Sequence, residues 1–193
     1  MATLRQWCLA GLAALSAVTG GLGCSVSMHR GRSDFGRSIR EGTRAYRNGN
    51  DPAAAASFRE AYEAAERAGN TGWMCAAAAM EGESCLRSGE PRKALQAVSA
   101  VNERGIGTFD THFVAGRAFI DVHEYDPARK QFEQAIHYRA PAGRLDAARS
   151  YAQFVGAILD YGAGDVPAAR EKISQIHDPA LRDVAVRHFG DTK

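Results

Sequence analysis

One stretch of 34 residues, Thr108–Pro141, constrains the fold of this chain more than any other. Its first helical run has small residues at the centre, Ala115 and Gly116, and is followed by a break at Glu124–Pro127. A second run places small and aromatic residues at positions i, i+4 and i+7, which share one face of a helix. These residues are Ala128, Phe132 and Ala135. The pattern predicts two helices joined by a turn, with these residues at the seam.

The same hairpin pattern recurs along the chain. The four copies span Phe35–Ala68, Cys75 to Thr108, Thr108–Pro141 and Ser150 to Asp183. Each has a glycine in its first run, followed by a turn: Gly42 with Asn48–Pro52, Gly82 with Ser88–Pro91, Gly116 with Glu124–Pro127, and Gly156 with Gly164–Pro167. The seam residues of the other second runs are Ala54, Phe58 and Ala61, then Ala94, Val98 and Val101, then Ala169, Ile173 and Ile176. Four copies with turns between them predict an all-α array of about four stacked hairpins.

The first seam alanines of the copies are spaced 40, 34 and 41 residues apart. The two longer intervals predict helices or loops extended by about two turns, at Glu66–Thr71 and Tyr138–Asp146.

The six prolines agree with these boundaries. Proline tolerates the first turn of a helix and disrupts its interior. Pro52, Pro91, Pro127 and Pro167 open second helices, Pro141 follows one, and Pro179 opens a last amphipathic run. The apolar residues of that run predict a C-terminal helix that caps the exposed end of the stack. They are Ala180, Leu181, Val184, Ala185 and Phe189.

Composition argues against several classes of function. A 193-residue chain with 45% hydrophobic and 24% charged residues is typical of one globular domain, and a net charge of +2 argues against nucleic-acid binding. The sequence has no phosphate-binding loop, no G-x-S-x-G elbow and no H-E-x-x-H pair. Its six histidines lack ligand spacing. We therefore expect no enzyme activity, no cofactor and no metal site.

The N-terminus has the features of a secretory signal. One basic residue, Arg5, precedes an apolar run from Trp7 to Val18, and small residues then lead to Cys24. The ending Leu22-Gly23-Cys24 resembles the lipobox of bacterial lipoproteins, although Gly21 stands where a leucine is usual. The resemblance implies cleavage after residue 23 and a lipid on Cys24. A secreted protein without lipid is the alternative.

The segment after Cys24 is short and polar. Ser25–Ser33 predicts a flexible tether between the lipid and a domain that spans residues 34–193. Ser25 implies sorting to the outer membrane, on its periplasmic face, in a Gram-negative host.

The hairpin of Thr108–Pro141 resembles a tetratricopeptide repeat, whose period is also 34 residues. The resemblance implies a right-handed solenoid in which the first helices line a groove for a partner. It places a row of candidate contacts on each first helix. The rows are Ile39, Thr43, Tyr46 and Arg47; Ala79, Glu83, Leu86 and Arg87; Phe113, Arg117, Ile120 and Asp121; and Tyr151, Phe154, Ile158 and Tyr161.

The groove residues that we expect to carry binding are aromatic or charged, the types that dominate interface energies. They are Tyr46, Arg47, Glu83, Arg87, Phe113, Arg117, Tyr151, Phe154 and Tyr161. Packing between neighbouring repeats is the alternative role for Phe113, Phe154 and Ile158.

Cys75 and Cys85 lie ten residues apart on one predicted helix, roughly 15 Å along its axis. A disulfide needs Cα atoms within about 7 Å. We therefore expect two buried thiols, and a redox pair only if the helix is absent.

The sequence thus favours a non-catalytic, lipid-anchored scaffold that binds a protein partner in the cell envelope. The alternative is a periplasmic module that binds a glycan or small ligand beside Tyr46, Tyr151 and Tyr161.

Overall fold

The computed structural model describes the backbone of residues 26–189 and the side chains from Arg32 onward. The predicted signal segment and Cys24 lie outside the described residues. Within that range all regular secondary structure is helical, and there are no strands. The helices are α2 (Val26–Arg47), α3 (Asp51–Arg67), α4 (Thr71–Arg87), α5 (Pro91–Glu103), α6 (Phe109–Asp121), α7 (Tyr125–Ile136), α8 (Ala142–Gly162), α9 (Val166–Ser174) and α10 (Pro179–Phe189).

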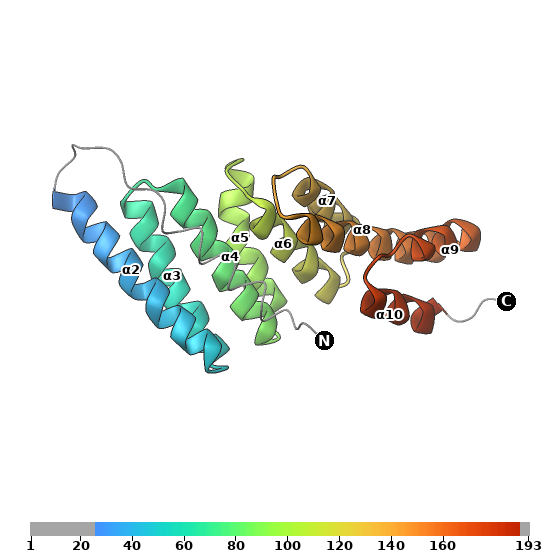
Figure 1. The fold of residues 1–193 in the computed structure, drawn as a ribbon, viewed down its shortest axis with the longest axis horizontal. Helices are drawn as coiled ribbons and strands as arrows, with labels where there is room; N and C mark the ends of the chain where they lie inside the picture. The colour runs from blue at the N-terminus through green and yellow to red at the C-terminus, as the bar shows by residue number, and fades with distance from the viewer. Residues whose placement is uncertain (1–25, 190–193) are drawn as a thin grey trace.

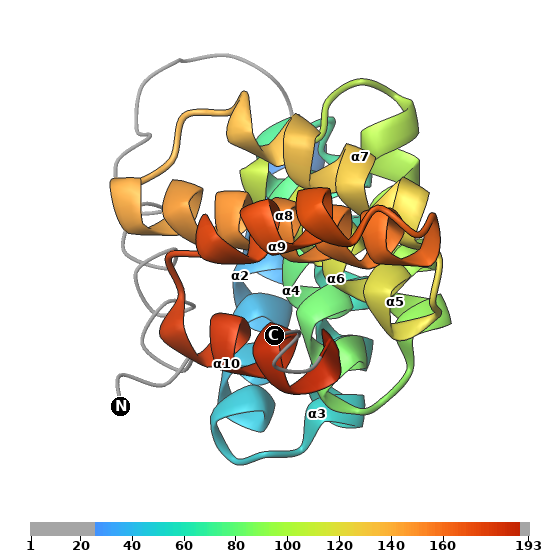
Figure 2. The same ribbon diagram turned by 90° about the vertical axis from the view of Figure 1, so that its right-hand side faces the viewer.

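The helices stack in chain order. Each packs against the next, α4 also packs against α6, and α10 packs against both α8 and α9. Figure 1 shows α2 at one end of an elongated array and α9 at the other. Figure 2 views the array from the α9 end and shows α8 and α9 side by side, with α10 next to them. The prediction of an all-α array of sequential hairpins is confirmed.

Short turns with one left-handed residue separate most of the successive helices. Gly49 has φ of +76°, and Asn50 then caps α3 by accepting a hydrogen bond from the Ala53 amide at 3.2 Å. Gly69 (φ +64°) and Asn70 repeat this arrangement before α4. The same turn therefore joins helices within a hairpin and between hairpins.

The third hairpin turns earlier than its sequence predicts. The break predicted at Glu124–Pro127 lies at residues 122–124, because α6 ends at Asp121 and α7 begins at Tyr125. His123 takes the left-handed conformation (φ +62°) that glycine has in the other turns. Pro127 lies within the first turn of α7, where its missing amide costs no hydrogen bond.

The predicted seams are present in the first three hairpins. Ala54, Ala94 and Ala128 are each 0% exposed. A Cβ atom built on Gly42 would lie 2.6 Å from the Phe58 ring, closer than real side chains approach. Glycine therefore allows the two helices of a hairpin to come together over an aromatic ring.

In the fourth hairpin Ala169 and Ile176 are each 1% exposed, as predicted, but the contact of the seam glycine is shifted by one residue. A Cβ atom on Gly156 would lie 2.8 Å from Cδ of Lys172, so Lys172 and not the predicted Ile173 faces this glycine. The amine of Lys172 forms an ion pair with Asp160 on α8. The shift arises because Gly156 lies nine residues before the capping Asp165, whereas Gly42 lies eight residues before Asn50.

The extra residues in the longer repeats lengthen the helices. Helices α3 and α4 have 17 residues each and α8 has 21, compared with 13 in α5 and 12 in α7. The link between α3 and α4 is only three residues long. The long intervals between seam alanines are therefore explained by longer helices.

The two ends of the described chain differ in how they match prediction. The sequence predicts a flexible tether over Ser25–Ser33, whereas the described backbone is helical from Val26 onward. At the other end α10 begins at Pro179 as predicted, and Ala185 and Phe189 are buried, although Val184 is 43% exposed.

In the part of the chain with described coordinates, every helix is too short or too polar to cross a bilayer.

Candidate functional site

Side chains from α2 and α4 meet where the sequence places the first two groove rows. The guanidinium carbon of Arg87 on α4 lies 4.0 Å from the ring centroid of Tyr46 on α2, a cation–π contact. The same guanidinium is 3.3 Å from Oδ1 of Asp51, the first residue of α3. Arg87 therefore joins three successive helices.

An ion pair connects the second and third hairpins. Nη1 of Arg117 on α6 donates a hydrogen bond to Oε2 of Glu83 on α4 at 2.5 Å. The two side chains are only 20% and 13% exposed. Burial raises the pKa of the Glu83 carboxyl above its ordinary value, and the positive charges of Arg117 and Arg87 oppose that rise. This pair is held inside the surface and is unlike a solvated ion pair.

Aromatic rings connect the third and fourth hairpins. The ring of Tyr151 on α8 stacks on Phe132 with centroids 5.1 Å apart and meets the edge of Phe113 at 5.5 Å. Burial is the main cause of a raised pKa for the Tyr151 hydroxyl. Tyr151 and Phe113 are half-buried, so each combines packing against the core with a part that stays accessible.

These contacts form one continuous line across alternate helices, which we name the first-helix row. It is defined by Tyr46, Glu83, Arg87, Phe113, Arg117 and Tyr151. Six of the nine predicted binding residues therefore lie in one line, each in contact with a neighbouring helix.

The other three predicted binding residues lie outside the row. Arg47 is exposed at the end of α2. Phe154 is 9% exposed within an apolar cluster of the last two hairpins, so little of its ring is open to a partner. Tyr161 is 43% exposed, and its ring centroid lies 5.0 Å from that of Phe189 on α10.

The remaining positions of the predicted rows differ in exposure. Ile39, Ala79 and Leu86 are buried and serve as packing residues. Thr43, Ile120 and Ile158 are half-buried, and Asp121 at the end of α6 is exposed.

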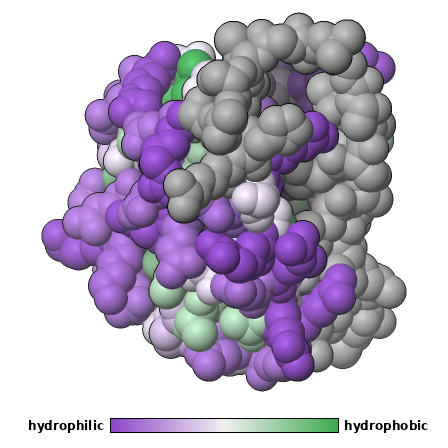
Figure 3. Space-filling view, turned by 90° about the vertical axis from the view of Figure 1, so that its left-hand side faces the viewer, coloured by the Kyte–Doolittle hydropathy of each residue, from purple (hydrophilic) through white to green (hydrophobic). Residues whose placement is uncertain are grey.

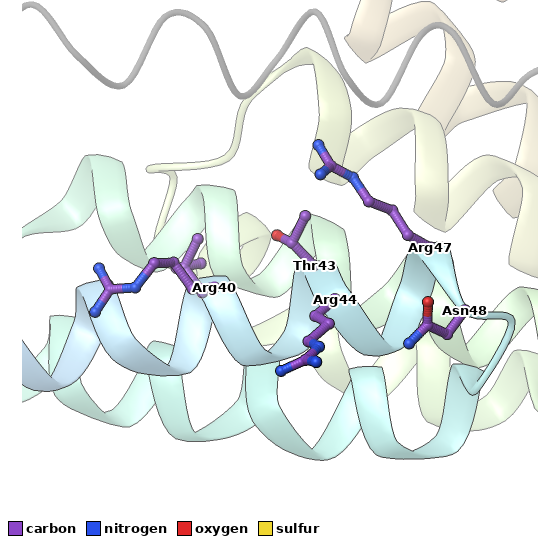
Figure 4. Close-up of a pocket in the computed structure, with 6 residues that line it drawn as sticks. Arg40, Thr43, Arg44, Arg47 and Asn48 are labelled. Carbon is purple, nitrogen blue, oxygen red and sulfur yellow. The ribbon is translucent and has the colours of Figure 1, made fainter.

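A shallow hollow of about 360 Å³ lies on α2. Its described wall consists of one face of that helix and the residue that follows it: Ile39, Arg40, Thr43, Arg44, Arg47 and Asn48. Figure 4 shows the side chains of Arg40, Arg44 and Arg47 pointing in different directions from the helix. One helix face does not enclose a small ligand.

The sequence did not predict an ion pair between the first two hairpins. Nε of Arg59 on α3 donates to both carboxylate oxygens of Glu81 on α4, at 2.8 and 2.9 Å. Glu81 is 5% exposed. Its position on an alanine-rich helix is the one feature of the sequence that indicates burial of this carboxylate.

The two cysteines are where the sequence predicts. Both lie on α4, both are free thiols and both are 3% exposed. Among the residues with described positions, no three histidine, cysteine or acidic side chains lie close enough together to hold a metal ion.

The fold and the row together define an all-α protein of stacked helical hairpins with a line of paired polar and aromatic side chains across alternate helices. In comparisons with known proteins, the chain matches no protein-family model, no curated protein and no solved structure.

Proposed function

We propose that this protein is a non-catalytic scaffold of the tetratricopeptide type, anchored in the cell envelope, that binds a protein partner along the first-helix row. The sequence of four hairpins with a small-residue seam supports the repeat type. A stack of repeats offers an extended surface in place of a closed pocket, which suits a polypeptide more than a small molecule.

The observation that carries the proposal is the first-helix row itself. Its members come from α2, α4, α6 and α8, so a polypeptide laid across the array would meet a residue from every hairpin. Arginine and tyrosine are frequent binding hot spots at protein interfaces. Arg117 and Arg87 are held by Glu83 and Asp51, and this pre-organisation lowers the entropy cost of binding.

The anchoring part of the proposal rests on the sequence. The apolar run before Cys24 and the small residues beside it support export and lipidation at that cysteine. The lipid would hold the array at a membrane surface, on the outer membrane if the host is Gram-negative.

A glycan or small-ligand module has less support. That hypothesis needs the three predicted tyrosines to line one pocket. Tyr46 instead contacts Arg87, Tyr151 packs on Phe132, and Tyr161 packs on Phe189. Tyr151 and Tyr161 are ten residues apart on α8, roughly 15 Å along its axis.

Tyr161 lies outside the first-helix row but on the predicted groove side of α8, where its 43% exposed ring tests whether the binding surface extends beyond Tyr151. If a partner covers it, Tyr161→Ala should weaken capture of that partner about thirtyfold, as expected for loss of a hot spot worth about 2 kcal/mol. Tyr161→Phe keeps the ring contact with Phe189 and separates binding from stability. Glu171→Ala, on the exposed side of α9, is the matched control.

The measurement is quantitative pulldown from envelope membranes, with thermal melts of each variant. If Tyr161→Ala captures the partner as well as wild type does, Tyr161 is not part of the binding surface. The same conclusion follows if Glu171→Ala loses as much capture as Tyr161→Ala.

A further inference from the structure

The first helix of the array is strongly basic. Helix α2 contains six arginines and two acidic residues, whereas residues 48–193 contain 17 basic and 20 acidic residues. The near-neutral net charge of the whole chain hides this separation. One end of the elongated array therefore carries an excess of positive charge (Figure 1).

Four of these arginines form a stripe on one side of α2. Arg37, Arg40, Arg44 and Arg47 follow one another at intervals of three, four and three residues, which places them on the same face of a helix. All four are exposed. We name this set the α2 arginine stripe.

The stripe lies opposite the face by which α2 packs on the array. Phe35 and Gly42 are buried, and at 100° per residue they lie on the other side of the helix from Arg40 and Arg44. The stripe therefore points away from the protein. Figure 3 shows that the visible part of this end of the molecule is mostly hydrophilic.

The arginines of the stripe have few charge partners. Arg37 is 3.0 Å from Asp34, while Arg40, Arg44 and Arg47 form no ion pair with another described residue. Figure 4 shows these three side chains fanning out from the helix. Side chains that diverge fit a broad anionic surface better than they fit one small anion.

We propose that the α2 arginine stripe lies on an anionic phospholipid surface, so that α2 rests flat on the membrane and the hairpins project away from it. The inference rests on the proposed lipid anchor, because Cys24 stands two residues before the start of α2. Charge complementarity and this position in the chain select a membrane over other anionic surfaces.

The geometry explains why α2 should lie flat. A helix of 22 residues is roughly 33 Å long. If α2 stood upright on its anchor, Arg37 to Arg47 would lie about 17 to 32 Å from the anchored end, beyond the ~8–10 Å range of charge attraction at physiological salt. A flat orientation brings all four guanidinium groups to the headgroups. It also leaves α8, α9 and α10 at the distal end of the array (Figure 1).

The test measures the reactivity of individual arginines in the full chain bound to vesicles. Phenylglyoxal modifies accessible guanidinium groups, and peptide mass spectrometry gives a rate for each arginine. Vesicles of phosphatidylcholine alone are compared with vesicles that also contain phosphatidylglycerol. Arg104 and Arg149, each 54% exposed and distant in sequence from α2, are the internal controls.

With phosphatidylglycerol present, the rates of the four stripe arginines should fall at least about threefold, while those of Arg104 and Arg149 stay unchanged. The protection should disappear in about 1 M salt, where charge attraction reaches only ~3 Å. Unchanged rates in the stripe, or equal protection of the controls, would overturn the inference. Protection seen in native membranes but never in protein-free vesicles would also overturn it and identify an acidic protein as the occupant.

Flotation with the phosphatidylcholine vesicles reports on the anchor separately. A chain that fails to float with neutral lipid lacks the proposed anchor, whatever the arginine rates are. A chain that floats without protection of the stripe keeps its anchor, and only the orientation of α2 is then wrong.

Discussion

Gly116 on α6 and Phe132 on α7 approach so closely that no larger residue fits at position 116. A Cβ atom built on Gly116 would lie 2.7 Å from Cζ of the Phe132 ring. The ring is 0% exposed, and protein interiors are close-packed. The pair fixes the distance between the two helices of the third hairpin, and Gly42 with Phe58 does the same in the first.

Gly116→Ala should therefore destabilise the protein, although alanine is the better helix former. Alanine gains up to about 1 kcal/mol of helix propensity, whereas overpacking a full core typically costs about 1–3 kcal/mol. We expect a net loss of about 1 kcal/mol or more in the free energy of unfolding, measured by urea denaturation. Gly162→Ala is the control, because its Cβ would meet nothing within 4 Å. Equal effects of the two substitutions would refute the close approach.

Glu83→Gln should not destabilise the protein at neutral pH. Burial raises the pKa of Glu83 in the folded protein, so its ionisation disfavours the folded state. Glutamine avoids that ionisation, and its amide oxygen can still accept from Arg117.

The difference between wild type and Glu83→Gln should depend on pH in one direction. A raised folded pKa means that wild type loses stability relative to the variant as pH rises through the acid range, and that the difference vanishes below about pH 4. Thermal melts across this range measure it. Glu133→Gln, at a 55% exposed carboxylate, should show no such trend. A variant that is markedly less stable at neutral pH would mean that the Arg117–Glu83 pair is net stabilising.

The thiols of Cys75 and Cys85 should be almost inert in the folded protein. Burial raises the pKa of both, that of Cys85 to about 11, so at pH 8 only about one Cys85 in a thousand is a thiolate. Iodoacetamide should modify both only after unfolding, as peptide mass spectrometry would show. A cysteine introduced at the exposed Arg92 should react readily in the native state. Rapid native labelling of Cys75 or Cys85 would contradict the packing of α4.

Cys24→Ser tests the anchor. The variant should remain uncleaved by the lipoprotein peptidase or be released in soluble form. Membrane fractionation and gel mobility distinguish these results from wild type. The same fractionation and mobility as wild type would exclude lipidation at Cys24.

The hairpins themselves could be predicted because their signals are local. Proline and glycine mark the turns, and Ala128 and Phe132 lie one helical turn apart on the same face. The sequence gives little indication of single-residue changes in helix length. The additional residue between Gly156 and Asp165 moves Lys172 to the seam, and left-handed His123 shortens the α6–α7 turn.

Contacts between hairpins could not be derived from the sequence, because they depend on how successive helices cross. Arg117 and Glu83 are 34 residues apart, and nothing in their neighbours indicates that they meet. The resemblance to a tetratricopeptide repeat assigned groove positions to these residues, but the sequence did not predict how deeply each side chain is buried. Phe154 is in the core and Tyr161 is exposed, although both lie on the predicted groove side of α8.

Photocrosslinking from α6 and α7 tests most directly that a protein partner binds along the first helices. A photoreactive amino acid replaces either Asp121 at the end of α6 or Glu133 on α7 of the same hairpin, both exposed side chains. After irradiation in cells, we expect a discrete crosslinked protein from position 121 and none from position 133. The same adduct from position 133, or no adduct from position 121, would contradict the proposed binding surface.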